Sequence, residues 1–324
     1  MEPLFLDSPM HEKIWGGNRL KAEFGYDIPS EHTGEYWAIS AHPNGVSYVK
    51  NGKYAGFHLA ELYKDKPELF GNPKTSVFPL LTKILDANDW LSVQVHPDDE
   101  YARTHENGSR GKTEMWYVLD AAKDSSLVYG FSQDMEREQL KKSIEDGTIG
   151  EYLQKIPVHK NDTFYIEAGT VHAIGAGCLM AEIQENSNLT YRMYDYDRQD
   201  KYGKKRPLHI ERALEVVKLD KSTPPGQPQR VLNYHRGCAT ELLCRCRYFQ
   251  VERMLFNTEQ CRQLLEYHTD STSFQVLLCI DGCGIMLKDG AGELQFFKGD
   301  CIFVPAGMDG IRIHGKGKML KVVC

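Results

Sequence analysis

Four side chains that could bind a metal ion fall within or beside short stretches with strand-like sequence. They are Gln94, His96, Glu114 and His172. In the stretch 92–96, Ser92, Gln94 and His96 alternate with two valines, so the polar and apolar side chains occupy opposite faces of a strand. Imidazole and carboxylate ligands without a thiolate suit Zn²⁺, Mn²⁺ or Fe²⁺, and such a site leaves a position open for water or substrate. We therefore expect an open metal site that performs chemistry.

An internal repeat indicates how these residues are positioned. Residues 162–172 align without gaps to residues 300–310. Each copy begins with aspartate, continues as a hydrophobic strand and bends at Ala-Gly before a second short strand. The chain is therefore expected to contain two β-domains.

The two copies differ where metal binding is concerned. The second has Gly310 at the place of His172, and it has Ser273 or Phe274 near the place that corresponds to Glu114. An upstream strand is expected at 115–119 in the first copy and at 274–279 in the second, followed there by a turn at 281–282. We expect a metal in the first domain and none in the second.

Two segments between the strands have helical character and are expected to be scaffold. The first spans 134–146, with Ser132 as its N-cap and Gly147 as its stop; the second spans 207–217, with Pro207 in its first turn. The acidic run 98–100 is interpreted as a helix start rather than a metal-binding patch, because carboxylates are favourable at a helix N-terminus.

A proline-rich run at 223–228 is the best candidate for a linker. It divides the chain into an expected metal-binding catalytic domain with helical segments, residues 1–222, and a linker with a second domain without metal ligands, residues 223–324. Of nine cysteines, eight lie in the last third of the chain, and with no CxxC motif we interpret them as small buried apolar residues.

Composition limits the classes of partner. The chain of 324 residues is 41% hydrophobic and 26% charged, with a formal net charge of −6 and no long basic run. Nucleic acid and anionic membranes are therefore poor partners, and a small molecule fits better. The N-terminus has no signal-peptide pattern and no segment is apolar enough to span a membrane, so a cytoplasmic location is expected.

A set of motifs in order makes a family resemblance specific. They are Trp15-Gly16-Gly17, Gly34-Glu-Tyr-Trp37, Pro79-Leu-Leu-Thr-Lys83-Ile-Leu-Asp-Ala87, Leu91-Ser-Val-Gln-Val-His-Pro-Asp98, Gly111-Lys-Thr-Glu-Met-Trp-Tyr117, Gly169-Thr-Val-His-Ala173 and Leu189-Thr-Tyr-Arg-Met-Tyr-Asp-Tyr-Asp-Arg198. The chain resembles type I mannose-6-phosphate isomerase, in particular its short bacterial form, within the cupin superfamily. The resemblance implies two cupin-type jelly-roll barrels, mainly β with peripheral helices, of which the C-terminal barrel has lost its ligands.

The resemblance also implies an activity and roles for individual residues. The activity is reversible isomerisation of mannose 6-phosphate and fructose 6-phosphate with one bound Zn²⁺. The implied zinc ligands are Gln94, His96, Glu114 and His172. The implied catalytic residue is Arg192, and the implied substrate-binding residues are Ser92, Lys112, Lys83 and Glu182. A monomer or small homo-oligomer is expected.

Elementary chemistry agrees with this activity. Moving a carbonyl from C1 to C2 of a sugar requires removal of a proton beside the carbonyl and its return one carbon away, while positive charge stabilises the enediolate oxygen. Glu182, Lys112, a metal-bound water or a hydroxyl relay could each act as the base, and a hydride shift is an alternative. Two other functions stay open at this point: a different metal cupin enzyme, such as an Fe²⁺ oxygenase or another sugar isomerase, and a sugar-binding cupin without catalysis.

Overall fold

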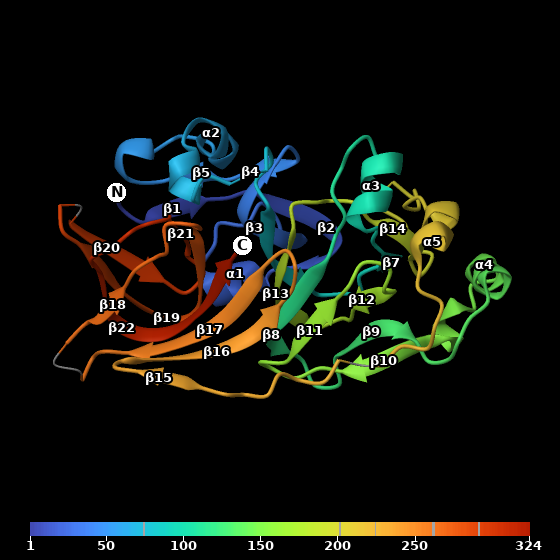
Figure 1. Ribbon diagram of the computed structural model, residues 1–324. Helices are drawn as coiled ribbons and strands as arrows, with labels where there is room; N and C mark the ends of the chain where they lie inside the picture. Colours follow the sequence, from blue (N-terminus) through green and yellow to red (C-terminus); the bar gives the residue numbers. More distant parts are fainter. Residues whose placement is uncertain (74, 201, 224, 261–262, 291) are drawn as a thin grey trace. The chain divides into compact units, whose positions relative to one another are not determined.

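The structure is a computed structural model of residues 1–324 (Figure 1), and it describes every residue except 74, 201, 224, 261, 262 and 291. Position 224 of the expected linker and Cys261 therefore lie outside the described residues. The chain forms two compact units. The terminal unit comprises Met1–Pro9, Trp37–Thr82 and Pro228–Cys324, and the central unit comprises Met10–Tyr36 and Lys83–Gln227.

The two units are not contiguous in sequence. The last crossing of the chain comes after Gln227, close to the boundary expected after residue 222. Two early segments, Met1–Pro9 and Trp37–Thr82, belong with the terminal unit instead of with the rest of the first 222 residues. Long-range strand pairing brings them there, as when β1 (Leu4–Asp7) pairs with β21 (Cys301–Val304), and local sequence patterns do not encode such pairing.

Two sheets carry the residues of the central unit. The five-stranded sheet, in the order β10-β9-β12-β7-β14, consists of β7 (Val93–Val95), β9 (Ser126–Phe131), β10 (Leu153–Pro157), β12 (His172–Ile174) and β14 (Tyr191–Tyr194). The seven-stranded sheet, in the order β11-β8-β13-β6-β3-β2 with β4 beside β3, consists of β2 (Met10–Gly17), β3 (Thr33–His42), β4 (Gly45–Val46), β6 (Leu80–Ala87), β8 (Glu114–Ala121), β11 (Thr163–Ile166) and β13 (Cys178–Glu185). The division between the units falls within β3 and β6, so β4 and parts of these two strands belong to the terminal unit.

The central unit also contains short helices. They are α1 (Arg19–Phe24), α3 (Asp99–His105), α4 (Arg137–Glu145), η3 (Ile149–Glu151) and α5 (Ile210–Val216). Helices α3 and α5 lie next to each other (Figure 1), and Tyr101 of α3 donates a hydrogen bond to Glu215 of α5. The expected helix start at the acidic run is confirmed, because the Asp98 side chain accepts a hydrogen bond from the Tyr101 amide at 2.8 Å.

Both helices predicted between the strands exist but are shorter than expected. Helix α4 begins after Glu136, and Ser132 does not cap it because its hydroxyl donates to the carbonyl of Tyr152 at 3.1 Å. Gly147 follows the helix end with a φ of 73°, as a stop residue should. Helix α5 begins at Ile210 and not at Pro207, so the proline precedes the helix.

The terminal unit is built on one ten-stranded sheet. Its main order is β15-β16-β17-β22-β19-β21-β1-β5, with β18 on β22 and β20 on β19. The strands not yet given are β5 (Tyr48–Val49), β15 (Asn233–His235), β16 (Cys238–Arg245), β17 (Gln250–Asn257), β18 (Leu265–Tyr267), β19 (Gln275–Lys288), β20 (Gly292–Phe297) and β22 (Ile311–Val323), and the helices are η1 (Gly52–Tyr54), α2 (Leu59–Asp65) and η2 (Pro67–Phe70).

The turn expected at Asp281-Gly282 is wrong. Strand β19 continues through these residues, and its register against β22 shifts between Cys279 and Asp281. Gly282 has a φ of 83°, which a bulged strand accommodates with glycine. The Asp-Gly pair that predicted a turn therefore marks a β-bulge at this position.

The expected fold class is confirmed, since the described chain is mainly β with few helices. Val93 and Val95 are buried in an apolar core, as the predicted alternation requires. Four of the described cysteines are buried while Cys283 and Cys324 are exposed, so the interpretation as buried apolar residues holds only in part. No helix among the described residues is long and apolar enough to cross a membrane.

Strand register locates the internal repeat in three dimensions. Strands β11 and β21 occupy aligned positions of the two copies, and the glycines of the two Ala-Gly bends, Gly169 and Gly307, both have positive φ. Ile166 of β11 lies opposite Glu114, and the aligned Val304 of β21 lies opposite Gln275. The residue equivalent to Glu114 is therefore Gln275, and the expected Ser273 or Phe274 is wrong by one or two positions.

Candidate active site

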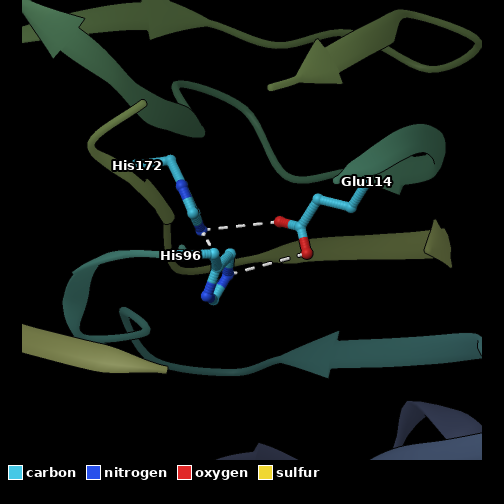
Figure 2. A group of neighbouring side chains, drawn as sticks. All are labelled: His96, Glu114 and His172. Carbon is cyan, nitrogen blue, oxygen red and sulfur yellow. Dashed lines mark hydrogen bonds and ion pairs between the residues drawn. The ribbon is translucent and has the colours of Figure 1, made fainter. Parts of the chain in front are cut away.

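His96, Glu114 and His172 converge within the central unit (Figure 2). One ligand atom from each lies within 4.8 Å of the others, and all three side chains are buried. Glu114 begins β8 and His172 begins β12, while His96 follows directly after β7. Three strands of two sheets thus bring together residues that are far apart in sequence.

The imidazoles of His96 and His172 point the lone pairs of their Nε2 atoms toward each other. His172 Nδ1 donates to the carbonyl of Thr170 at 2.8 Å, which leaves Nε2 as an acceptor. His96 Nε2 accepts from the ammonium of Lys112 at 3.1 Å and lies 3.1 Å from His172 Nε2. Two acceptors this close repel unless a cation or proton lies between them, so this geometry fits a metal ion.

Burial shapes the ionisation of the cluster. It lowers the pKa of His172 to about 4 and that of His96 well below its usual range, so both imidazoles are neutral and available as ligands. Burial raises the pKa of Glu114 to about 7; the Glu182 carboxylate adds to this shift, and the Lys112 ammonium, 2.7 Å from Glu114 Oε2, opposes it. No described residue donates a hydrogen bond to Glu114 Oε1.

Gln94, the fourth predicted ligand, lies beside the cluster. Its Nε2 is 3.3 Å from His172 Nε2, and β7 pairs it directly with His172 on β12. The Ser92 hydroxyl donates to the Gln94 side-chain oxygen at 3.4 Å. Gln94 is therefore placed where it could either bind a metal or orient a water.

A backbone clamp holds the segment that carries Lys112 and Glu114. The amide of Lys112 donates to the carbonyl of Pro97 at 3.0 Å, next to His96, and the amide of Thr113 donates to the Glu185 carboxylate at 2.9 Å. A Cβ on Gly111 would lie 2.4 Å from the backbone of Asp98, so the two segments approach closely enough to require glycine. The clamp keeps these two residues in fixed relation to His96.

A cavity of about 270 Å³ lies beside the cluster. Six of the nine predicted site residues line it: Lys83, Ser92, Gln94, Lys112, Glu182 and Arg192. The other three are the buried cluster itself. The structure therefore brings all nine predicted residues together in one unit.

Charges divide the cavity into two ends. Near the cluster, Lys83 pairs with Glu182 at 3.1 Å, and Lys112 lies 4.0 Å from the same carboxylate. Burial would raise the pKa of Glu182, but the ammonium groups of Lys112 and Lys83 outweigh it and hold that pKa below the usual range. Glu182 is therefore ionised at neutral pH.

The other end of the cavity is cationic. Arg192 donates to the Ser92 hydroxyl at 3.2 Å, and burial together with the nearby Arg206 lowers the pKa of Arg192. Arg206 donates from Nε to Asp195 at 2.8 Å, and Arg198 shares the same carboxylate. Arg198 and Arg206 thus share the buried Asp195, while the nearby Arg192 has no carboxylate partner among its hydrogen bonds to the described residues, which leaves a net positive charge suited to an anion.

Several cavity residues were missed in the sequence. They are Lys13, Glu35, Asn188, Thr190 and Arg206. Glu35 lies in a motif of the family resemblance but has no predicted role, and Arg206 ends the short basic run Lys204-Lys205-Arg206. This basic run, which follows an arginine-containing strand motif, is the available signal for Arg206. Thr190 lies within the motif that contains Arg192, and Asn188 lies just before it.

Comparisons with known proteins identify the family. The model described as "Phosphomannose isomerase type I, catalytic domain" matches residues 4–123, and that described as "Mannose-6-phosphate isomerase, cupin domain" matches residues 240–324. Mannose-6-phosphate isomerase ManA of Bacillus subtilis (strain 168) is 44% identical over 317 residues, covering 97% of this chain and 96% of that protein. The chain belongs to the type I phosphomannose isomerase family.

Further similarities agree with membership of this family. A mannose-6-phosphate isomerase of Streptococcus mutans serotype c is 60% identical over 220 residues, covering 68% of this chain and 69% of that protein. The crystal structure of the mannose 6-phosphate isomerase from Bacillus subtilis matches with a TM-score of 0.92 at 37% identity, covering 99% of both chains. The motif-based family prediction is confirmed, and with it the enzyme class, an aldose–ketose isomerase.

Proposed function

We propose that this enzyme interconverts mannose 6-phosphate and fructose 6-phosphate at a Zn²⁺ site by proton transfer through an enediol or enediolate. The observation that carries the proposal is one cavity that lies beside a metal-binding cluster and has two guanidinium groups, Arg192 and Arg206, in its lining. A phosphosugar fits such a cavity, because its reacting carbons need an acid and a base and its phosphate needs cationic side chains.

His96, Glu114 and His172 would hold the metal, with Gln94 as a further ligand or as the residue that orients a water. The donor set of nitrogens and carboxylate oxygen without thiolate suits zinc, and the facing lone pairs of the two histidines favour a bound cation. When bound, the ion supplies positive charge that stabilises negative charge developing on substrate oxygen.

The cationic end would bind the phosphate. Arg192 contacts Ser92 and faces the cavity beside Arg206, so the two guanidinium groups offer planar forks to a phosphate or to a substrate hydroxyl. Placing the phosphate there directs C1 and C2 toward Lys112 and Glu182. In this orientation Arg192 would bind the substrate and stabilise it during the reaction. Lys83 would keep the Glu182 carboxylate in position through their ion pair.

Glu182 would carry the proton. It lines the cavity, it is ionised, and Trp116 Nε1 donates to its Oε2 at 3.3 Å, which fixes the carboxylate. In the direction from aldose to ketose, Glu182 would remove the proton from C2 and return it to C1, and the hydroxyl proton would move from O2 to O1 while Lys112 donates a hydrogen bond to these oxygens. Lys112 also lies against Glu114, so it would connect the metal ligands to the substrate.

A coupled assay tests the reaction and the metal together. Mannose 6-phosphate is supplied with phosphoglucose isomerase, and glucose 6-phosphate is measured for the purified enzyme, after chelator treatment and after zinc is restored. We expect activity that chelation abolishes and zinc restores. Full activity after complete removal of metal would contradict the zinc proposal while leaving the isomerase class in place.

Isotope exchange tests the proton route separately. In D₂O, proton transfer through an enediol introduces deuterium at C1 or C2 of recovered substrate and product, whereas a hydride shift does not. We expect deuterium incorporation by the wild type and its loss in Glu182→Gln. Conversion without any incorporation would overturn the enediol route.

A further inference from the structure

The terminal unit contains a larger cavity than the catalytic one. Its volume is about 830 Å³, and residues of β16, β17, β18, β19 and β22 line it. The polar side chains Thr240, Tyr267, Gln275 and Lys321 are among them. Polar groups inside a β-domain cost free energy unless they are paired or bind something.

Strand register places this cavity at the position of the metal site in the repeat. Gln275 is equivalent to Glu114, and Gly310 aligns with His172. Strand β18 runs beside β22 as β7 runs beside β12, and continuing its register by one residue beyond Tyr267 sets His268 opposite Gly310, the place of Gln94.

The equivalent of His96 follows from the same register and is Asp270. A conserved backbone hydrogen bond supports it within this one chain: the Gly169 amide donates to the His96 carbonyl at 2.9 Å, and the Gly307 amide donates to the Asp270 carbonyl at 2.9 Å. His268, Asp270 and Gln275 all line the cavity. The second copy thus keeps a polar cavity where the first has its metal cluster.

The replacements leave no metal site of the first kind. The Tyr267 hydroxyl donates to the Gln275 side-chain oxygen, and Asp270 Oδ1 accepts from the Thr272 amide at 2.7 Å. Within the described part of the chain, the one group of three potential His, Cys or carboxylate ligands close enough to hold an ion is in the central unit. A ligand of this cavity would therefore be recognised by hydrogen bonds and charge.

The inner ion pair is retained with its signs exchanged. Glu182 lies opposite Trp116, and Lys321 lies opposite Leu277, which is the equivalent of Trp116. Glu182 pairs with Lys83 at 3.1 Å, and Lys321 pairs with Glu252 at 2.6 Å. Both copies therefore keep a charged pair on the inward face, although an apolar pair would pack there at lower cost.

Two guanidinium groups also line the cavity, together with the carboxylates of Glu266 and Asp270. Arg312 pairs with Asp289 at 2.8 Å, whereas Arg236 Nη1 donates to the neutral side chain of Gln263 at 2.6 Å. Because a neutral acceptor leaves the charge of Arg236 uncompensated at that contact, an anion is the fitting partner. We propose that this cavity is a second, metal-independent binding site for a sugar phosphate, with Arg236 on the phosphate and Gln275, Tyr267 and His268 on the hydroxyls.

Titration calorimetry with mannitol 1-phosphate tests the proposal on the zinc-loaded enzyme. This hexitol phosphate has no carbonyl and cannot be isomerised. We expect two binding events per chain in the wild type. In Arg236→Ala only the event at the catalytic cavity should remain, and in Arg192→Ala only the event at the terminal cavity, because affinity at the altered site falls at least tenfold. The matched control is Arg245→Ala, because Arg245 also donates to a glutamine, Gln250 at 2.7 Å, and does not line the cavity; it should keep both events.

The isomerase assay keeps this result separate from the proposed function. Arg236→Ala and Gln275→Ala should retain kcat/KM within about twofold while losing the second binding event. Inorganic phosphate should compete for that event and unphosphorylated mannitol should not. A single event per chain in the wild type, or two undiminished events in Arg236→Ala, would overturn the second site whatever the isomerase assay shows.

Discussion

The two copies of the repeat keep the same strands and differ in the side chains on their inward faces. Strand β11 and its counterpart β21 have the same length and the same bend after them, with positive-φ glycine in both. At the four ligand positions, the central unit has Gln94, His96, Glu114 and His172, and the terminal unit has His268, Asp270, Gln275 and Gly310. The same backbone can therefore be built with or without a cluster of metal-binding side chains, and the residues at four positions determine whether the cluster is present.

The difference also shows what each copy requires from its surroundings. In the central unit the cluster is enclosed, and a clamp of backbone hydrogen bonds holds Lys112 and Thr113 against neighbouring segments. In the terminal unit the equivalent of Glu185 is Cys324, which has a thiol side chain in place of the carboxylate and whose main-chain oxygen accepts a hydrogen bond from the Ser273 hydroxyl at 3.0 Å. Precise positioning accompanies the copy that is proposed to do chemistry.

The largest expected effect tests the ligand positions directly. His96→Ala should remove zinc and lower kcat/KM by roughly 10³-fold or more, because the remaining ligands cannot keep the ion in place. Its counterpart Asp270→Ala should change neither zinc content nor kcat/KM appreciably. Metal analysis and the coupled assay measure both. A loss of zinc in Asp270→Ala, or full zinc in His96→Ala, would break the comparison between the copies.

The next effect concerns the guanidinium groups. Arg192→Ala should lower kcat/KM by roughly 10²–10³-fold, since it removes a positioned cation from the cavity beside Ser92. Arg192→Lys should recover little, because an ammonium cannot reproduce the planar donor fork. Arg312→Ala, in the terminal copy, is the control and should retain isomerase activity. Equal kinetics for the three variants would show that the cationic end of the catalytic cavity has no special role.

Much of this arrangement follows from sequence because it is local or comes from the repeat. Period-2 alternation correctly separated Val93 and Val95 from Gln94, and the gap-free alignment of 162–172 with 300–310 correctly paired β11 with β21. The acidic run correctly indicated a helix start. These signals depend on neighbouring residues, so no knowledge of distant contacts was needed.

The errors arise where distant contacts decide. Gln275, not Ser273 or Phe274, matches Glu114, because register is set by pairing with β21 and not by alignment of upstream residues that share no motif. The grouping of Met1–Pro9 and Trp37–Thr82 with the last third of the chain depends on strand pairing across hundreds of residues. Arg206 became a cavity residue only through Asp195, which binds it and Arg198 together.

A smaller effect is expected at that aspartate. Asp195→Asn removes the charge that holds Arg206 and Arg198, and lost charge-assisted hydrogen bonds of this kind cost about 1.5–3 kcal/mol. We expect KM for mannose 6-phosphate to rise roughly tenfold with a smaller change in kcat, because substrate positioning suffers more than the reacting end. Steady-state kinetics separate the two constants. Asp289→Asn, which disturbs Arg312 of the terminal unit, is the matched control and should leave KM unchanged.

The last effect concerns the Glu185 carboxyl in the clamp of the central copy, and it acts on stability and not on the kinetic constants. Burial, with Asp99 nearby, raises the pKa of Glu185 to about 8, so the folded state holds a proton that the unfolded chain releases near its ordinary pKa of 4.5. Because burial raises the carboxyl pKa, the protonated Glu185 contributes its full stability below about pH 4.5, and this contribution is lost as the pH rises through about 8. Urea unfolding at pH 5 and pH 9 should show this decline in the wild type and much less of it in Glu185→Gln, which cannot ionise. Glu167→Gln, at an exposed ion pair with Lys218, should keep the wild-type dependence; an unchanged pH dependence in Glu185→Gln would mean that the clamp does not hold its proton.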